Sequence, residues 1–163
     1  MGKEIERKFL VNGDAWRSLA QGIIYRQGYL NSSKERTVRV RTVGDKAFMA
    51  VKGIASGITR AEYEYEIPVE DCNAMLDALV EKPVIEKKRY TISFEGLVWE
   101  VDEFFGENQG LVVAEVELQS EGQQVFKPAW IGEEVSGDPR YCNSNLVKHP
   151  FIEWRGMKDG KNR

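Results

Sequence analysis

The chain has 163 residues, of which 42% are hydrophobic and 30% charged, so one globular domain with a real core is the expected organisation. A formal net charge of −3 argues against a broad nucleic-acid footprint, and no apolar run approaches the roughly 20 residues needed to span a bilayer. The charged start of the sequence and two cysteines without metal-type spacing favour a cytoplasmic protein without a signal peptide.

The first segment, 3–11, alternates in a way that is typical of a strand. Glu4, Glu6 and Lys8 stand at every second position, so on a strand they project from one face. In a helix the same spacing would scatter the three charges, because residues two apart do not face each other. We therefore expect a strand that presents two carboxylates and an ammonium in one row.

The segments that follow show further strand signals, separated by short polar turns. Runs rich in β-branched and aromatic residues predict strands, and Gly44-Asp45 between two of them predicts a hairpin. Apolar residues at helical spacing predict one helix over 70–80, and Glu95-Gly96 then divides another hairpin. Beyond Gly122 the pattern weakens into short helices and loops. The later strands are expected over 24–30, 37–43, 46–52, 60–69, 84–94, 97–105 and 111–118.

About eight strands and few helices indicate a mainly β, α+β fold. We expect an eight-stranded antiparallel β-barrel that is closed, with a few peripheral helices. The sequence contains no internal repeat, low-complexity tract or linker. A single domain is therefore expected over 1–163, with 154–163 as a flexible tail.

Charged residues recur at every second position on most of the expected strands. The residues between them tend to be apolar, as at Val40, Val101 and Val116. One face of each strand would therefore be charged while the other is buried. The alternating charges after the first strand are Arg39 and Arg41; Lys52; Glu62, Glu64 and Glu66; Lys87 and Arg89; Glu100 and Asp102; and Glu115 and Glu117.

Two arrangements explain this alternation. In the first, the charges form a solvated outer face whose cross-strand ion pairs contribute about tenths of a kcal/mol each. That explanation is adequate for any one pair but weakens when the strands all share the pattern, because apolar side chains would then have to fill the lumen. In the second, roughly a dozen charges face inward, which requires a water-filled lumen and a highly charged ligand, since desolvation costs several kcal/mol per ion.

The two signs of charge would suit two different ligands. Arg and Lys suit a polyanion such as a string of phosphates. Carboxylates suit hard divalent cations, which prefer oxygen ligands. Phosphoryl transfer requires both, since metal and cations neutralise charge on the transferred group. The cationic set is Lys8, Arg39, Arg41, Lys52, Lys87 and Arg89, and the carboxylate set is Glu4, Glu6, Glu62, Glu64, Asp102, Glu115 and Glu117.

These ordered constellations resemble the CYTH superfamily, the triphosphate tunnel metalloenzymes. Glu4-x-Glu6-x-Lys8 is similar to the family's N-terminal signature, the later charged pairs follow in the expected order, and 140–146 looks like the family's C-terminal stretch. The resemblance implies an eight-stranded tunnel that binds a small-molecule triphosphate with Mg²⁺ or Mn²⁺, and it is compatible with a homodimer. Known family activities are inorganic triphosphatase, thiamine triphosphatase, RNA triphosphatase and class IV adenylate cyclase.

The opening sequence looks most like the short bacterial members that hydrolyse tripolyphosphate, so a metal-dependent triphosphatase is the leading hypothesis. Its cations, Lys8, Arg39, Arg41, Lys52, Lys87 and Arg89, would hold phosphate oxygens and stabilise the transition state. Glu4, Glu6, Glu115 and Glu117 would bind metal, and Glu62, Glu64 and Asp102 would ligate a second ion or orient water, with Glu62 and Glu64 also facing the substrate. The identity of a general base stays open.

Two other functions stay open as well. A class IV-type adenylate cyclase would use the same grip to convert ATP to cyclic AMP and pyrophosphate, but no sequence feature identifies the adenine pocket that it needs. A polyphosphate- or nucleotide-binding module without turnover is the third hypothesis. Among single segments, Tyr29 is expected either at a tunnel mouth or packed within its strand, and 151–154 is expected to plug one tunnel end.

Overall fold

The computed structural model describes residues 2–156, and within that range it contains nine strands in antiparallel pairing and few helices. The strands are β1 (Lys3–Val11), β2 (Ile23–Asn31), β3 (Arg36–Val43), β4 (Lys46–Gly53), β5 (Thr59–Ile67), β6 (Ile85–Phe94), β7 (Leu97–Phe104), β8 (Val112–Glu117) and β9 (Ile131–Glu134). The α-helices are α1 (Val69–Ala78), α2 (Asn143–Lys148) and α3 (Phe151–Trp154), and the 3₁₀ turns are η1 (Ala15–Ser18), η2 (Gly106–Asn108) and η3 (Pro139–Tyr141).

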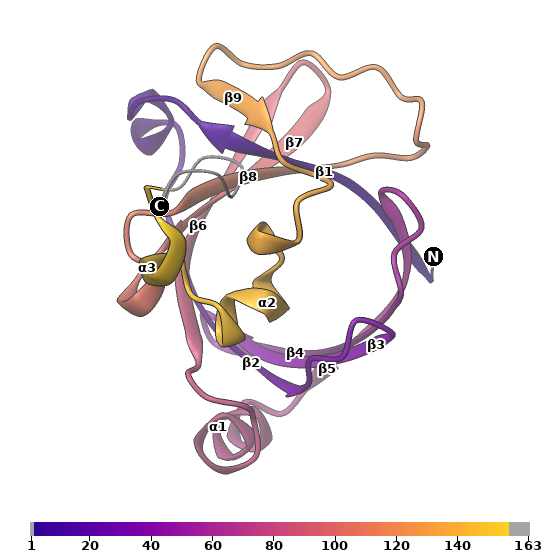
Figure 1. The fold of residues 1–163 in the computed structure, drawn as a ribbon, viewed down its shortest axis with the longest axis vertical. Coiled ribbons are helices and arrows are strands. Elements are labelled where there is room, and N and C mark those ends of the chain that lie inside the picture. Colours follow the sequence, from indigo (N-terminus) through magenta and orange to yellow (C-terminus); the bar gives the residue numbers. More distant parts are fainter. Residues whose placement is uncertain (1, 157–163) are drawn as a thin grey trace.

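Eight of the strands close into a barrel, as predicted (Figure 1). Their order is β5-β4-β3-β2-β6-β7-β8-β1, and a further pairing of β1 with β5 joins the two ends of the sheet. β1 makes this closure because its first residues pair with β5, from Lys3 opposite Ala61, while Glu6 onward pairs with β8. A closed barrel has no exposed edge between these strands.

The ninth strand was not predicted from the sequence. β9 is short and pairs only with the last part of β1, where Val11 lies opposite Ile131 and Phe9 opposite Glu134. The register shifts between these two pairs. A four-residue strand with one glycine carries no alternation long enough to recognise, so its formation depends on the free side of β1 beyond the barrel.

The hairpin turns follow from local residue chemistry. Glu95 and Gly96 both have positive φ, +51° and +80°, between the paired residues Phe94 and Leu97. Two central residues in this region give the turn type whose twist matches the flanking strands. The hairpin at this point therefore fixes the register of β6 against β7, and with it the alignment of the charged residues on both strands.

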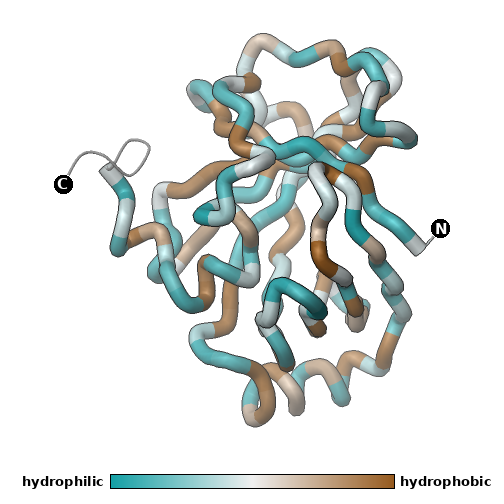
Figure 2. Tube along the Cα trace, turned by 45° about the vertical axis from the view of Figure 1, so that its right-hand side comes forward, coloured by the Kyte–Doolittle hydropathy of each residue, from teal (hydrophilic) through white to brown (hydrophobic). Residues whose placement is uncertain are grey.

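The main hydrophobic core lies on the outer face of the barrel wall. Phe9, Trp99 and Val116 project outward from β1, β7 and β8 and are buried together with Trp16 of η1. Elsewhere α1 covers the outside of the wall, where its Leu76 shares a buried cluster with residues of β3 and β4. Figure 2 shows the consequence as hydrophilic and hydrophobic segments that alternate along the strands. Because the apolar positions serve these outer layers, the charged positions face the lumen.

One end of the lumen is closed by apolar packing around α2. Phe104 and Val113 face inward there and join Leu146 of α2 in one buried cluster. In Figure 1, α2 lies within the outline of the ring of strands. The segment 151–154, expected as the plug, forms α3 and supplies Trp154 to this same cluster, but the element inside the ring is α2, while α3 packs against η2.

The tail expected over 154–163 lies mostly outside the described residues. Trp154 itself is buried, with its ring centroid 5.2 Å from that of Tyr141. No helix in the range 2–156 combines the length and apolar character that crossing a membrane requires.

Candidate active site

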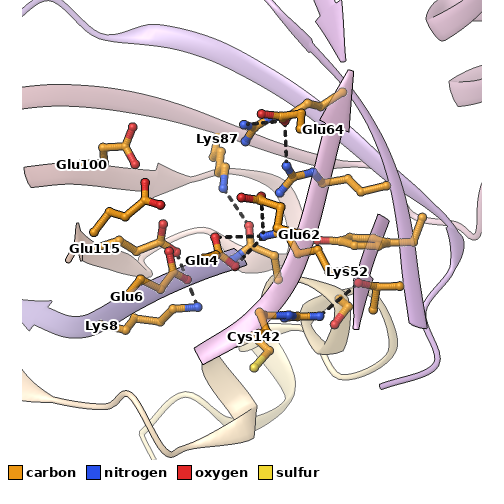
Figure 3. A pocket seen from close by; sticks show the side chains of 18 of the residues that line it. Glu4, Glu6, Lys8, Lys52, Glu62, Glu64, Lys87, Glu100, Glu115 and Cys142 are labelled. Carbon is orange, nitrogen blue, oxygen red and sulfur yellow. Dashed lines mark hydrogen bonds and ion pairs between the residues drawn. The ribbon is translucent and has the colours of Figure 1, made fainter. Parts of the chain in front are cut away.

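The charged half of the lumen encloses a cavity of about 250 Å³. Inward side chains of all eight barrel strands line it, together with residues 142–144 at the start of α2 (Figure 3). Seven of the lining residues are Lys or Arg and seven are Glu, so their formal charges cancel over the whole wall. The lumen is therefore polar where the outer face of the same strands is apolar.

The two signs of charge are separated around the barrel. Strands β6, β2, β3 and β4 are consecutive and form what we call the basic arc, and β5, β1, β8 and β7 form the acidic arc. The basic arc carries Lys87, Arg89, Arg39, Arg41 and Lys52, and the acidic arc carries Glu62, Glu64, Glu4, Glu6, Glu115, Glu117 and Glu100. Lys8 and Arg60 are the two lining cations that belong to acidic-arc strands. A polyanion can thus lie along one wall while a cation is held against the other.

Asp102 anchors the basic arc from behind. Its Oδ1 accepts from Arg89 Nε at 2.7 Å and its Oδ2 from Arg89 Nη2 at 2.8 Å. Lys87 Nζ lies 2.9 Å from the same Oδ2. Asp102 is only 1% exposed, and although burial alone would raise its pKa, Arg89 and Lys87 hold that pKa far below its usual range. The two cations are consequently fixed in position by one ionised carboxylate.

Lys87 is the most enclosed cation of the wall. It is 2% exposed, and burial lowers its pKa to about 8, with Arg89 acting in the same direction and Asp102 against it. Arg41 has its pKa lowered by burial and by the charges of Arg39 and Arg89. Burial is the main cause of both shifts, so an anion in the cavity would favour the charged forms of Lys87 and Arg41.

Tyr25 of β2 contacts three cations of the basic arc with its aromatic ring. The centre of its ring lies 4.9 Å from the guanidinium carbon of Arg89, 5.1 Å from that of Arg41 and 6.0 Å from Lys87 Nζ. An aromatic face attracts cations through its quadrupole. Tyr25 therefore gathers three like-charged groups without neutralising any of them.

Shared carboxylates hold the rest of the arc. Glu64 Oε2 lies 3.2 Å from both Arg39 Nη2 and Arg41 Nη2. Lys52 Nζ lies 3.1 Å from Glu4 and 3.4 Å from Glu62. The Nε atoms of Arg39 and Arg41 are buried yet have no hydrogen-bond partner among the described residues. Buried donors of this kind cost about 1–3 kcal/mol each if left unpaired, which adds to the cost of packing the two guanidinium groups side by side.

The acidic arc holds carboxylates that lack counter-charge. Burial, together with Glu115 and Glu4, raises the pKa of Glu6 to about 8. The pKa of Glu117 is raised as well, by burial and by Glu4 and Glu62. No described side chain forms an ion pair with Glu6 or Glu117. A bound cation would remove this unfavourable crowding of negative charge.

Lys8 connects the acidic arc to the segment before α2. Its Nζ lies 3.5 Å from Glu115 Oε2 and donates to the Tyr141 carbonyl oxygen at 3.3 Å. Burial alone would lower the pKa of Lys8, but Glu115 and Glu6 raise it above its usual value. Lys8 therefore stays protonated across the physiological range.

The structure brings all but one of the site residues predicted from the sequence to the cavity wall. The exception is Asp102, which lies behind the wall with both oxygens occupied by Arg89 and Lys87. The reason is depth: Asp102 is inward-facing, as its alternation with Glu100 indicates, but the two long cationic side chains lie between it and the lumen. Tyr29 combines both expectations, because it lines the cavity and also packs in the apolar cluster at the α2 end.

Several wall residues were not selected from the sequence. Glu100 and Arg60 alternate in phase with selected charges, so the period-two pattern alone would have found them. Thr37 is uncharged and gave no signal. Cys142, Asn143 and Ser144 reach the lumen only because the chain returns into the barrel before α2.

The cavity offers carboxylates to a metal ion but no preformed cluster of ligands within residues 2–156. Among the described residues, no three His, Cys, Asp or Glu side chains converge closely enough to form a ready-made metal site. The donor chemistry nevertheless fits a hard divalent cation, because the acidic arc consists of carboxylates and two of them have raised pKa values. The carboxylate oxygens are therefore the right type of ligand for such an ion, and oxygens of the substrate would have to complete its coordination.

Comparison with known proteins gives matches over most of the chain. The family model described as CYTH domain matches residues 2–149. An inorganic triphosphatase of Acetivibrio thermocellus is 62% identical over 155 residues, which cover 95% of this chain and 99% of that protein. An inorganic triphosphatase of Nitrosomonas europaea is 39% identical over 148 residues, covering 88% and 96%. The crystal structure of the inorganic triphosphatase NE1496 superimposes with a TM-score of 0.64 at 35% identity, covering 88% of this chain and 96% of that one.

Proposed function

The chain belongs to the CYTH domain family, and on that premise we propose that it is a metal-dependent triphosphatase that hydrolyses inorganic tripolyphosphate. The observation that carries the proposal is the division of one small cavity into a basic and an acidic arc. The relatives named inorganic triphosphatase support the same activity. The resemblance drawn from Glu4-x-Glu6-x-Lys8 is thereby confirmed at the level of the family.

The basic arc would bind the phosphate chain. Tripolyphosphate presents acceptor oxygens along its whole length, and Arg39 and Arg41 line the cavity with guanidinium groups that can donate to them. Lys87, Arg89 and Lys52 extend the same wall on neighbouring strands. The ligand would therefore bring negative charge to a wall of five cations.

The acidic arc would hold the divalent cation that the family implies. Glu4, Glu6, Glu115 and Glu117 are the ligands that we propose, with Glu62 and Glu64 available for a second ion or for a water molecule. When bound, Mg²⁺ or Mn²⁺ would neutralise phosphate oxygens and lower the pKa of a coordinated water. Asp102 is reassigned from ligand to positioning residue, because both of its oxygens already accept from the basic arc.

Hydrolysis would divide tripolyphosphate into pyrophosphate and orthophosphate. The oxygen of water bonds to a terminal phosphorus, the bridging oxygen departs with pyrophosphate, and one proton of the water is released. Charge spreads over the terminal phosphate oxygens in the transition state. Arg39, Arg41, Lys87 and Arg89 would stabilise that charge from fixed positions, which costs little reorganisation during the reaction.

The cavity favours an inorganic substrate over a nucleotide. Its volume of about 250 Å³ lies below the range of about 300–1,000 Å³ that is usual for organic ligands. Tyr29 is the one aromatic residue in the described lining, and the residue is only 5% exposed. A base would therefore find neither room nor a stacking surface within the cavity, which weighs against the cyclase hypothesis. ATP would have to leave its nucleoside outside the barrel.

The test is a phosphate-release panel with tripolyphosphate, ATP and thiamine triphosphate, each with Mg²⁺ and with Mn²⁺. We expect tripolyphosphate to have the highest kcat/KM, and no release in the presence of EDTA. Formation of cyclic AMP from ATP would instead support the cyclase hypothesis. Tight tripolyphosphate binding without release under any metal would support the binding module and overturn the proposed activity.

A further inference from the structure

Asn143 is the first residue of α2 and is tied to the wall of the barrel by its side chain. Lys87 Nζ donates to Asn143 Oδ1 at 2.7 Å, and Gln27 Nε2 donates to the same oxygen at 2.9 Å. Both donors are buried, Gln27 completely, while Asn143 itself lines the cavity. The amide thus lies at the boundary between a dry wall and the open lumen.

The direction of this amide is determined by chemistry. An ammonium group has donors only, so Asn143 must present its oxygen to Lys87. Its Nδ2 consequently points away from Lys87 and Gln27, and it donates to no other group in the described part of the chain. It is also not among the buried atoms that lack a partner, so it is open to the lumen.

Gln27 supports the same orientation at a cost. Its Nε2 points to Asn143 and also lies 3.3 Å from the Tyr29 hydroxyl, whereas its own Oε1 is buried without a partner among the described residues. Turning Gln27 around would place two oxygens against each other. An unmet buried acceptor costs about 1–3 kcal/mol, so the wall sacrifices stability in keeping the Asn143 oxygen held from two sides.

The arrangement also directs Lys87. Of the three N–H donors of its ammonium group, one serves Asp102 and one serves Asn143. One donor remains for a ligand, and Lys87 and Asn143 both line the cavity. The wall therefore offers one charged and one neutral donor to a ligand rich in acceptor oxygens, such as a phosphoryl group.

We infer that Asn143 is a substrate-positioning residue that donates from Nδ2 to the terminal phosphoryl group of the triphosphate at the α2 end of the cavity. The inference rests on the proposed function and adds to it the group that receives one end of the substrate. Because α2 closes the lumen there, the phosphoryl group that Asn143 contacts is the last of the chain.

The decisive variant is Asn143→Asp. Its carboxylate still accepts from Lys87 and Gln27, but it cannot donate to phosphate. Asn143→Ala loses both roles, because it removes the shared acceptor as well. A purely structural role therefore predicts that Asn143→Asp recovers what Asn143→Ala loses, whereas a positioning role predicts that it does not. Asn145→Asp places the same change on α2 outside the cavity wall, and serves as the matched control for added charge.

The measurements are tripolyphosphate kinetics, tripolyphosphate binding by calorimetry in EDTA, and the melting temperature of each variant. For Asn143→Asp we expect KM to rise and binding to weaken by about 10- to 100-fold, with a melting temperature no lower than that of the parent chain. Asn145→Asp should stay within about twofold in both assays.

Parent-level kinetics and binding in Asn143→Asp would overturn the inference while leaving the proposed function intact. An equal loss in Asn145→Asp would overturn it too, because added charge alone would then explain the effect. If the parent chain itself released no phosphate from tripolyphosphate, the proposed function would fail, and unchanged tripolyphosphate binding in Asn143→Asp would then exclude the contact separately.

Discussion

Replacement of Asp102 by Asn distinguishes a positioning role from the metal-ligand role that the sequence suggested. In the structure, Asp102 accepts two hydrogen bonds from Arg89 and lies 2.9 Å from Lys87 Nζ, with its side chain 2% exposed. An amide is nearly the same size, but its NH₂ must face one of these donors. The substitution therefore removes the counter-charge of two buried cations and brings two donors together.

The magnitude follows from burial. Breaking a buried ion pair by removing one partner costs about 3–5 kcal/mol. In a chain of this length, 1 kcal/mol shifts the melting temperature by about 2–4 °C, so a decrease of about 6–20 °C is expected. Loss of Asp102 also lowers the pKa of Lys87 further below about 8, because Asp102 raises it more than any other neighbouring charge does. Lys87 would then lose its proton at a lower pH, and KM for tripolyphosphate should rise more at pH 8 than at pH 6.

The assays are thermal unfolding, kinetics at both pH values and a Mg²⁺ titration. Glu103→Gln is the matched control, since it makes the same change on β7 in a partly exposed ion pair with Arg17. A positioning role predicts a lower melting temperature with half-saturation by Mg²⁺ unchanged within about threefold. An unchanged melting temperature together with a Mg²⁺ requirement raised tenfold or more would refute the reasoning and restore Asp102 as a metal ligand.

Two further predictions concern the two arcs. Glu6 has a folded-state pKa raised from its usual value to about 8, so without metal its ionisation reduces stability as the pH rises from about 4.5 to 8. Glu6→Gln should therefore raise the metal-free melting temperature at pH 8 but not at pH 4, and should abolish metal-dependent phosphate release; a lower melting temperature at pH 8 would contradict this account. Tyr25→Leu should raise KM about three- to tenfold by releasing Arg41 and Arg89, while Tyr25→Phe keeps the aromatic face and should stay near parent values. Equal effects of the two changes in steady-state kinetics would exclude a role of the ring.

Much of the barrel was predictable because a strand has a period of two. The alternation of Glu4, Glu6 and Lys8 assigned one face of β1, and the same parity on the later strands assigned one charged face to each. Apolar residues on the opposite face indicated where the outer layers would pack. These inferences need no knowledge of distant contacts, since the direction of a side chain on a strand follows from its position.

The residues of the acidic and basic arcs were therefore identifiable, but their partners were not. The alternation of side chains along β7 predicts that Asp102 and Glu100 share a face, but it does not predict how far each carboxylate lies from the lumen. That depth depends on how Lys87 and Arg89, two residues apart on β6, fold over Asp102 on the paired strand. A long Lys or Arg side chain can reach several carboxylates, and which of them it pairs with depends on the packing of the complete barrel.

The sequence by itself determined that most strands carry one charged face, because alternation is a local property, and the order of these charges resembles the CYTH family that the chain belongs to. The tertiary structure decided which strands are neighbours and which side chains meet, because these contacts join residues far apart in the chain. The closure of β1 onto β5, the separation of the two arcs and the return of α2 into the lumen all depend on strand order. Asn143 has no local pattern at all, and it became a candidate only where α2 brought it against Lys87 and Gln27.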